Sequence, residues 1–406
     1  MPPQSEPPQS ADSALPALGE RTLFPDIDAL AYLAHAAISP LSLPVRRAIE
    51  SAAREASTGV VGFQRSLPMR ARLRERLARL IGARAENLSF VANTTSGVLD
   101  IAFGHPWRAG DRIVLFEGEF PANTTPWLSA ARTFDLKPIW VPLAAFERSD
   151  DEGIAALDIA LAGGAALIAV SAVQFQTGLR MPLRRIAERA RSHGARLFVD
   201  AIQGLGAVPI DVAQGCDYLS AGAHKWLMGS DGAGLLYVSD DAMQALEPKL
   251  VGWLSHEDPL EFLIQGEGYL RYDRPLRRQA DLFEQGMLAT ISLAGLDAST
   301  AILESLGVAA IYEHTQRYVD RLESALVERG WSSARAPEAD RRSAILSLRP
   351  PAGVDLLAVH RGLEARRIRC SLPDGWLRFA PHWPNPLDEL SLVIDALDET
   401  VDALER

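Results

Sequence analysis

Two residues 25 positions apart carry the clearest chemical signal in this sequence. Asp200 ends a strand-like run, ARLFVD, and Lys225 follows a second such run in DYLSAGAHKW. A carboxylate at the carboxyl end of a buried strand lies on the edge of an α/β sheet where ligands bind. A lysine held among apolar neighbours has a lowered pKa and can form a Schiff base as a nucleophilic amine. The pair therefore predicts amine chemistry, although each residue alone could be a helix cap or a solvated lysine.

Lysine is rare in this chain, in which almost all positive charge is arginine. The only lysines are Lys137, Lys225 and Lys249. Lys137 in DLKPIW and Lys249 in EPKLVG have the surroundings of solvated loop lysines, whereas Lys225 lies among Ala, Gly, His and Trp. A reaction that needs a lysine therefore has one strong candidate.

Pyridoxal 5′-phosphate (PLP) accounts for this pair of residues. It needs a lysine for its aldehyde, an acid for its pyridine nitrogen, a phosphate cradle and a flat face for its ring. Thr94 and Thr95 stand between a strand and a helix in VANTTSGVLDIA, where backbone N–H groups and hydroxyls form an anion site. Phe120 follows a strand in EGEFPANTTPW and can stack on a ring. Taken singly, the threonines could be helix caps and Phe120 a core residue, so the prediction rests on all four features together.

The elements that must position these residues follow an alternating pattern. Short apolar runs, typical of buried strands, alternate with amphipathic helical stretches such as Met69–Ile81 and Pro182–Ser192. Continuous apolar strands separated by helices predict a mostly parallel, doubly wound sheet with ligands at the carboxyl ends of the strands. The seven expected strands are Leu88–Ala92, Arg112–Glu117, Pro138–Pro142, Ala166–Ala172, Arg196–Asp200, Tyr218–Ala221 and Gly234–Ser239.

The pattern changes near residue 286 and predicts a second, smaller α+β domain. We expect a disordered tail over residues 1–20, a large domain over 21–285 that includes an N-terminal arm at 21–45, and the small domain over 286–406. The small domain should contain helices at Thr290–Leu306, Val308–Arg329, Val354–Arg366 and from Pro386, with strands at Ala344–Leu348 and Trp376–Phe379.

Composition narrows the class of protein. The 406 residues are 48% hydrophobic and 23% charged, with 41 Lys and Arg against 52 Asp and Glu, a net charge of −11. This balance argues against a nucleic-acid-binding or basic membrane-surface protein. Two cysteines exclude a disulfide scaffold and leave too few thiols for a cysteine-based metal site, and no metal is expected. No apolar run reaches a bilayer's width and no signal peptide is visible, so we expect a cytoplasmic protein.

The order of these motifs resembles the class V aminotransferase family of fold-type I PLP enzymes. That family includes cysteine desulfurases, kynureninases and isopenicillin N epimerase-like proteins. The resemblance covers roughly residues 28–400, and its most specific parts are FVDAIQGLGAVPIDV and CDYLSAGAHKWLMGSDGAGLLYV. It implies that Lys225 holds PLP as a Schiff base and Asp200 binds the pyridine nitrogen. It also implies that Gln203 contacts the phenolic oxygen and that Phe120 stacks on the ring.

The resemblance further implies how the phosphate is held. His224 would bind it together with Thr94 and Thr95. In this family the neighbouring subunit of a homodimer also contributes to the phosphate site, through a segment that matches FEQGMLAT here. Gly286 and Met287 would then offer backbone N–H groups across the interface.

The substrate site follows from two other matching segments. GWLRFAPHWPN resembles the strand whose arginine binds the α-carboxylate of an amino acid substrate, which would be Arg378. A guanidinium suits this role because it pairs with a carboxylate through two parallel hydrogen bonds. LAHAAISPLS resembles the segment at the substrate entrance and places His35 and Ala36 there. Trp253 in VGWLSH resembles a kynureninase cofactor contact and could also cross the interface, unless it is a core tryptophan.

The sequence differs from the desulfurases and kynureninases of this family at three places that bear on the reaction. The stretch RRIRCSLPDGWLR is shorter than the cysteine-bearing loop of desulfurases, with Cys370 at its beginning, and Cys216 is expected in the core, so a cysteine desulfurase is judged unlikely. Kynureninases carry Tyr where this chain has His224, and Asp where it has Asn123. The expected activity is an aminotransferase that acts on the Cα amine of an amino acid. The alternatives are a PLP-dependent lyase or epimerase and, from another class, a non-catalytic PLP-binding regulator; no GxGxxG supports a dinucleotide-binding protein.

Overall fold

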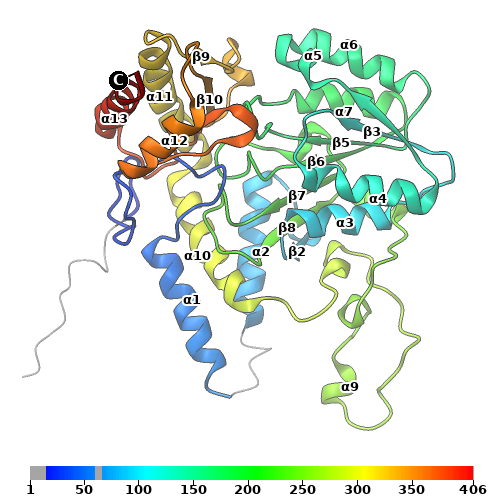
Figure 1. Cartoon of the computed structure of the whole chain (residues 1–406). Coiled ribbons are helices and arrows are strands. Elements are labelled where there is room, and N and C mark those ends of the chain that lie inside the picture. Colours follow the sequence, from blue (N-terminus) through cyan, green and yellow to red (C-terminus); the bar gives the residue numbers. More distant parts are fainter. Residues whose placement is uncertain (1–14, 60–65, 406) are drawn as a thin grey trace, which may run out of the picture.

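The computed structural model describes residues 15–59 and 66–405, so the tail expected over residues 1–20 lies largely outside it. A seven-stranded sheet forms the centre of the large domain, in the order β2-β8-β7-β6-β5-β3-β4 (Figure 1). Only β8 runs antiparallel to its neighbours in this sheet. The strands are β2 (Leu88–Val91), β3 (Arg112–Phe116), β4 (Lys137–Val141), β5 (Leu167–Ser171), β6 (Arg196–Asp200), β7 (Tyr218–Gly222) and β8 (Gly234–Val238).

Apart from the edge strand β4, the strands are buried on both faces because alternate side chains enter two separate cores. In β5, Leu167 and Ala169 pack under α3 (Thr94–Gly104) and α4 (Thr125–Phe134). Ile168 and Val170 of the same strand enter the opposite core, which is covered by helices from both halves of the chain. Those helices are α2 (Leu67–Ile81), α5 (Leu143–Arg148), α6 (Asp150–Leu161), α7 (Leu183–Ser192) and α10 (Thr290–Leu306). The predicted doubly wound fold is confirmed, and each of the seven strands predicted for this sheet matches an observed one to within one residue at each end.

The small domain packs three helices around a short antiparallel sheet of order β12-β10-β9. Its core joins the buried faces of all three helices to these strands and to β11. The N-terminal arm enters this core as well, because β1 (Ala31–Tyr32) pairs in parallel with β11 (Ile368–Arg369). The remaining elements are α11 (Val308–Val327), α12 (Leu356–Ala365), α13 (Leu390–Glu405), β9 (Ser332–Ser333), β10 (Leu346–Arg349) and β12 (Leu377–Phe379).

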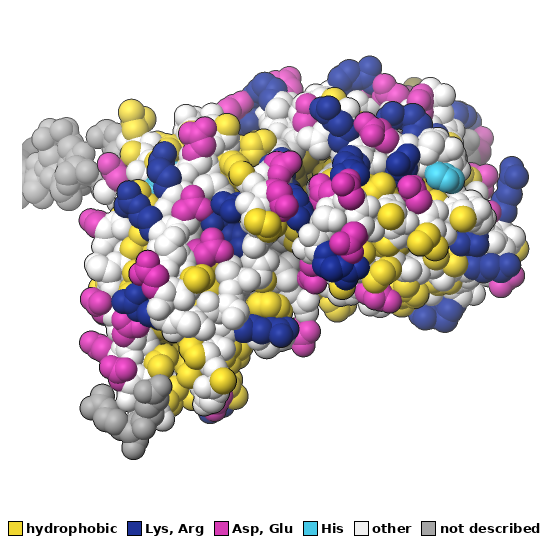
Figure 2. All heavy atoms as spheres, turned by 90° about the horizontal axis from the view of Figure 1, so that it is seen from above, with side chains coloured by type: hydrophobic (Ala, Val, Ile, Leu, Met, Phe, Trp, Pro, Cys, Tyr) yellow, Lys and Arg dark blue, Asp and Glu magenta, His cyan; other side chains and the backbone are white. Residues whose placement is uncertain are grey.

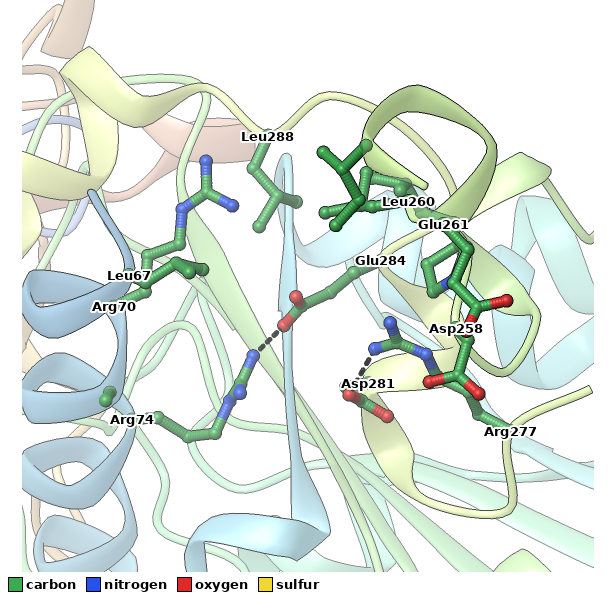
Figure 3. A pocket seen from close by; sticks show the side chains of 14 residues that line it. Leu67, Arg70, Arg74, Asp258, Leu260, Glu261, Arg277, Asp281, Glu284 and Leu288 are labelled. Atoms are coloured by element: carbon green, nitrogen blue, oxygen red, sulfur yellow. Dashed lines mark hydrogen bonds and ion pairs between the residues drawn. The ribbon is translucent and has the colours of Figure 1, made fainter. Parts of the chain in front are cut away.

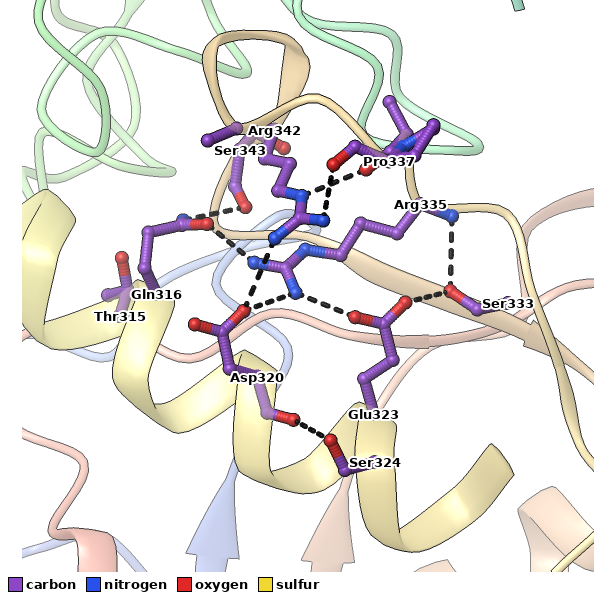
Figure 4. Close-up of polar contacts among 12 residues, drawn as sticks. Thr315, Gln316, Asp320, Glu323, Ser324, Ser333, Arg335, Pro337, Arg342 and Ser343 are labelled. Atoms are coloured by element: carbon purple, nitrogen blue, oxygen red, sulfur yellow. Dashed lines mark hydrogen bonds and ion pairs between the residues drawn. The ribbon is translucent and has the colours of Figure 1, made fainter. Parts of the chain in front are cut away.

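A buried arginine fastens the edge of this sheet to α11 (Figure 4). The guanidinium of Arg335 donates to Asp320 at 2.6 Å, to Glu323 at 2.7 Å and to Gln316 at 2.6 Å. A charge removed from water is tolerated when it is paired and hydrogen-bonded in this way. The network therefore fixes β9 and β10, and β10 in turn pairs with β12, where Ser347 lies opposite Arg378.

The expected boundary at residue 286 stays a prediction, and the packing across it is extensive. Buried residues of α10 such as Leu293 belong to the large-domain core, and α10 packs against α1 (Leu43–Ala56). The short helices α8 (Asp240–Ala245) and α9 (Glu261–Ile264) lie between β8 and α10, and the loop that carries α9 projects from the large domain (Figure 1). The small domain is thus joined to the sheet through α10 as well as through the arm.

The described surface mixes charges of both signs. Figure 2 shows Lys and Arg side chains interspersed with Asp and Glu over the face in view, without a continuous patch of one sign. Among the described helices, no single one is long and apolar enough to cross a bilayer. Helices α10 and α11 are long and apolar enough only when they are counted as one segment, and that segment is bent by 78°.

Candidate active site

A cavity of about 400 Å³ opens at the carboxyl ends of the central strands. It is formed by the loops that follow β2, β3, β5, β6 and β7, with β12 of the small domain on the opposite side. This is the position at which α/β sheets bind ligands. Most of the residues expected at the site line this one cavity, namely Ala36, Thr94, Thr95, Phe120, Asp200, Gln203, His224, Lys225 and Arg378.

Lys225 follows β7 in a tight turn and is buried, with 8% of the residue exposed. Its Nζ lies 5.3 Å from the ring centre of Phe120 and forms no hydrogen bond or ion pair with any residue that the structure describes. Burial lowers the pKa of the Lys225 amine to about 8, against the opposing influence of the nearby Asp200 charge. A substantial fraction of the amine is therefore neutral at physiological pH, and no hydrogen-bond or ion-pair partner among the described residues competes for it, as a Schiff-base lysine requires.

Asp200 ends β6 and is almost fully buried. Its Oδ1 accepts a hydrogen bond of 3.0 Å from the backbone N–H of Ile202. Burial raises the pKa of Asp200 from its ordinary 3.8 to about 7; the neighbouring Glu119 raises it further and Lys225 lowers it. A carboxylate in this state gains most from a cationic N–H partner, so it suits the pyridine nitrogen of PLP.

The start of α3 forms the expected anion site. Asn93 caps the helix by accepting a 2.9 Å hydrogen bond from the N–H of Ser96. The hydroxyl of Thr94 already accepts a 2.9 Å hydrogen bond from the N–H of Gly222 and ties the helix to β7, whereas Thr95 is exposed to the cavity mouth. The helix can approach so closely because Gly97 has no side chain; a Cβ there would lie 2.3 Å from the hydroxyl of Ser220.

His224 completes this side of the cavity. It is half-buried, and burial together with the adjacent Lys225 charge lowers its pKa, so its ring is neutral at physiological pH. A neutral imidazole has one N–H that it can donate to a phosphate oxygen. The helix N-terminus, Thr95 and His224 are therefore compatible with the phosphate group of PLP.

Arg378 on β12 faces the cavity from the small domain and is 4% exposed. It donates to the hydroxyl of Ser371 at 2.9 Å and to the carbonyl oxygen of Phe175 at 2.6 Å. Burial lowers its pKa to about 10, so it stays charged, yet it contacts no acidic side chain within the described chain. The buried Arg335 and Arg341, by contrast, each pair with two carboxylates. Arg378 is therefore a buried cation whose missing partner is an anion in the cavity.

Several predicted site residues lie elsewhere. The ring of His35 is buried against Ser39 and His382 and does not line the cavity, although the neighbouring Ala36 does. Trp253, Gly286 and Met287 also lie outside it; they remain predictions that concern a partner subunit.

A larger cavity, of about 520 Å³, lies beside the segment that holds these three residues (Figure 3). Three of the four carboxylates that line it pair with arginines: Glu284 with Arg74 and Asp281 with Arg277, as the dashed lines in Figure 3 show, and Glu261 with Arg274. Carboxylates and arginines that pair with each other already neutralise one another and are not available to react. The smaller cavity around Lys225 is therefore the candidate active site.

Sequence reasoning missed two contributors to the site. Phe175 lines the cavity and packs edge-on against Phe120, with ring centres 5.3 Å apart. Glu119 is buried behind Asp200 and accepts hydrogen bonds from the N–H and the hydroxyl of Ser171. A signal existed for both, since Glu119 directly precedes Phe120, and Phe175 lies in VQFQTG just after β5.

The comparisons with known proteins identify the family of this chain. The family model described as aminotransferase class V matches residues 32–371. An uncharacterised aminotransferase of Bacillus subtilis, YcbU, is 26% identical over 93% of this chain and 96% of its own. A probable cysteine desulfurase of Pyrococcus abyssi is 28% identical over 82% of this chain and 83% of its own. Among solved structures, a mutant of C-DES with glycine covalently linked to its PLP cofactor has a TM-score of 0.84 at 22% identity, covering 93% of this chain and 98% of that one.

One expectation is wrong in the light of these relatives. The short cysteine-bearing stretch suggested that a cysteine desulfurase is unlikely, yet a probable cysteine desulfurase matches over most of the chain. Loop length near Cys370 therefore does not separate this chain from desulfurases. The match over residues 32–371, together with the lysine, aspartate and arginine that face one cavity, leads to one assignment. The chain belongs to the aminotransferase class-V family.

Proposed function

We propose that this protein acts on the Cα amine of an α-amino acid and transfers its amino group, with PLP as its cofactor. The observation that carries the proposal is that Arg378 and Lys225 face the same cavity. Arg378 is a buried guanidinium without a carboxylate, and Lys225 is a buried amine without a partner among the described residues. An α-amino acid brings both a carboxylate and an amine, so it satisfies the two groups at once.

Each of the cavity residues has a separate role in the proposed reaction. When bound, PLP withdraws electrons from the Cα atom of an amino acid attached to it. Lys225 holds the cofactor and, once released, can take the Cα proton, because its pKa of about 8 lies near physiological pH. Asp200 keeps the pyridine nitrogen protonated through its own negative charge. Phe120 covers the ring, and Arg378 fixes the carboxylate so that the Cα–H bond stays near Lys225.

Of the candidate reactions, amino-group transfer requires the fewest proton-carrying side chains in this cavity. It needs one group that carries a proton between two atoms on the same side of the cofactor. Among the described residues that line the cavity, the titratable ones are Asp200, His224, Lys225 and Arg378. Three of them have the binding roles given above, which leaves Lys225 to move protons. Epimerisation would require a second proton carrier on the opposite face.

Sulfur release from cysteine is a second candidate, supported by the similarity to the probable cysteine desulfurase. A panel of amino acids added to PLP-loaded protein separates the candidates. Transamination should convert an added keto acid into a new amino acid, whereas desulfuration should convert cysteine into alanine without a keto acid and leave the sulfur as a persulfide on an added thiol. A lyase would release a side-chain fragment, and an epimerase would give the mirror-image substrate. A regulator would bind PLP and turn over none of them.

The assembly that we propose is a cytoplasmic homodimer. The homodimer is supported by the apolar side chains exposed along the segment 250–291, which includes Met287 at 68% exposure and Trp253 at 43%. Exposed apolar clusters of this kind are typical of protein interfaces. The same segment carries the residues expected to reach the partner's phosphate site.

A further inference from the structure

A chain of hydrogen bonds behind the cavity joins Ala36, Gln203 and Trp226. Gln203 follows β6, Trp226 directly follows Lys225, and Ala36 belongs to the N-terminal arm. The indole Nε1–H of Trp226 donates to Oε1 of Gln203 at 2.9 Å. Nε2 of Gln203 donates to the carbonyl oxygen of Ala36, also at 2.9 Å. All three residues are buried, so water does not compete for these groups.

These two partners leave the Gln203 amide a single orientation. An indole N–H can only donate and a backbone carbonyl can only accept, so a flipped amide would lose both hydrogen bonds. The Nε2 group has two N–H bonds, and only one of them is used by Ala36. Because Gln203 lines the cavity, the remaining N–H is a donor available to whatever occupies it.

Trp226 is itself held firmly. His382 accepts a 2.7 Å hydrogen bond from the N–H of Trp383 through Nδ1, so its Nε2 donates to the carbonyl oxygen of Trp226 at 2.9 Å. Gly206 packs directly on the same carbonyl, since a Cβ there would lie 2.3 Å from that oxygen. The backbone of Trp226 is therefore fixed, and its indole packs against the ring of His382, with centres 5.5 Å apart, and does not line the cavity.

We infer that Trp226 is a positioning residue that orients the amide of Gln203, so that Gln203 presents an N–H to the phenolic oxygen of PLP. The inference rests on the proposed function. An N–H donor stabilises a phenolate and weakens its hold on a neighbouring proton. Loss of the indole donor frees the amide to rotate, and the phenolate then loses part of this stabilisation.

The test compares two tryptophans. Trp226→Phe removes the indole donor and keeps an aromatic ring. Trp383→Phe is the matched control, because Trp383 is equally buried but its indole nitrogen has no hydrogen-bond partner in the described structure. PLP is titrated into each cofactor-free protein, and the visible absorbance of the bound cofactor is then followed against pH.

We expect Trp226→Phe to weaken PLP binding by roughly 3- to 10-fold, the effect of one lost hydrogen bond. The pH midpoint of the absorbance change should rise by roughly half a unit to one unit. Trp383→Phe should leave the midpoint unchanged. Gln203→Glu tests the same interaction from its other end, because a carboxylate accepts from the indole but has no N–H, and it should also raise the midpoint.

A double variant separates orientation from packing. If Trp226 acts through Gln203, Trp226→Phe should shift the midpoint in the wild-type background and have no further effect in Gln203→Ala. Equal midpoints for Trp226→Phe and Trp383→Phe, or additive shifts in the double variant, would overturn the role of Trp226. A wild-type protein that forms no adduct with PLP would overturn the proposed function as well, so the two failures are distinguishable.

Discussion

The guanidinium of Arg378 in the small domain donates a 2.6 Å hydrogen bond to the backbone carbonyl of Phe175 in the large domain. This contact crosses the cavity wall and orients the arginine without neutralising its charge. Ser371 fixes the Nε side of the same group at 2.9 Å. The remaining Nη2 atom has no partner among the described residues, so the arginine is oriented and still able to bind an anion.

Arg378→Ala should lower kcat/KM for the amino acid substrate by roughly 30- to 1000-fold, or about 2–4 kcal/mol, through loss of a charge-assisted pair. Arg378→Lys should recover only part of this loss, because an ammonium cannot form the planar pair of hydrogen bonds. PLP affinity should be unchanged. The measurement is steady-state kinetics, with the decarboxylated amine of the substrate for comparison.

Arg349→Ala is a suitable control, since Arg349 is exposed on the neighbouring strand β10 over the ring of Trp376. It should retain wild-type kinetics. A wild-type enzyme that used the amino acid and its decarboxylated amine equally well would refute the carboxylate-binding role of Arg378.

Lys225→Ala should abolish the PLP that borohydride fixes covalently to the protein, because reduction needs the Schiff base with this amine. Mass spectrometry after reduction measures the label. Lys137→Ala, at an exposed position on β4, should keep full labelling. Full labelling or full activity of Lys225→Ala would remove the lysine from the mechanism.

Asp200→Asn should still bind PLP but lose turnover by orders of magnitude, because a neutral amide no longer keeps the pyridine nitrogen protonated. Rates of substrate-dependent absorbance change in single-turnover experiments measure this step. An unimpaired rate would mean that the charge of Asp200 has no part in the reaction.

The same residue predicts a pH-dependent stability of the cofactor-free protein. Burial raises the pKa of Asp200 from 3.8 to about 7, so between these pH values the unfolded chain binds fewer protons than the native one. The free energy of unfolding therefore falls as pH rises through this window. Asp200→Asn removes the effect, and its Tm should rise relative to wild type between pH 4 and pH 8. An equal Tm difference at both pH values would contradict the raised pKa.

Met287→Asp should weaken a homodimer, because it places a charge in the exposed apolar segment 250–291. Sedimentation velocity over a range of protein concentrations measures the change. Leu357→Asp, at an exposed leucine on α12, is the control and should leave the assembly intact. A wild-type monomer that binds PLP tightly would speak against a shared phosphate site.

The sequence predicted the sheet well because all its strands except the edge strand β4 are buried on both faces and therefore appear as continuous apolar runs. Strand ends also located Asp200, Lys225 and Thr95, since the carboxyl ends of parallel strands share one edge. What the sequence could not give is the direction of a side chain once its strand has ended. Thr94 therefore turned out to bond to β7, and the ring of His35 points away from the cavity.

The pairing of strands that are far apart in the sequence could not be predicted either. The pairing of β1 with β11 joins segments more than 330 residues apart, and neither strand has more than two residues. Strands this short leave no periodic pattern to detect. The burial of Arg378 likewise depends on residues distant in the sequence, such as Phe175, so its missing counter-charge could be seen only in the folded chain.

The N-terminal arm limits how the two domains can move. Tyr32 is fastened to the small domain through β11, and Ala36 is fastened to Gln203 beside the sheet. The intervening chain can span at most about 14 Å when fully extended. A wide opening of the small domain would break one of these attachments. Arg378 should therefore stay at a nearly constant distance from Lys225. For the function proposed above, this predicts selection among amino acids by the fit of their side chains rather than by a large closing motion.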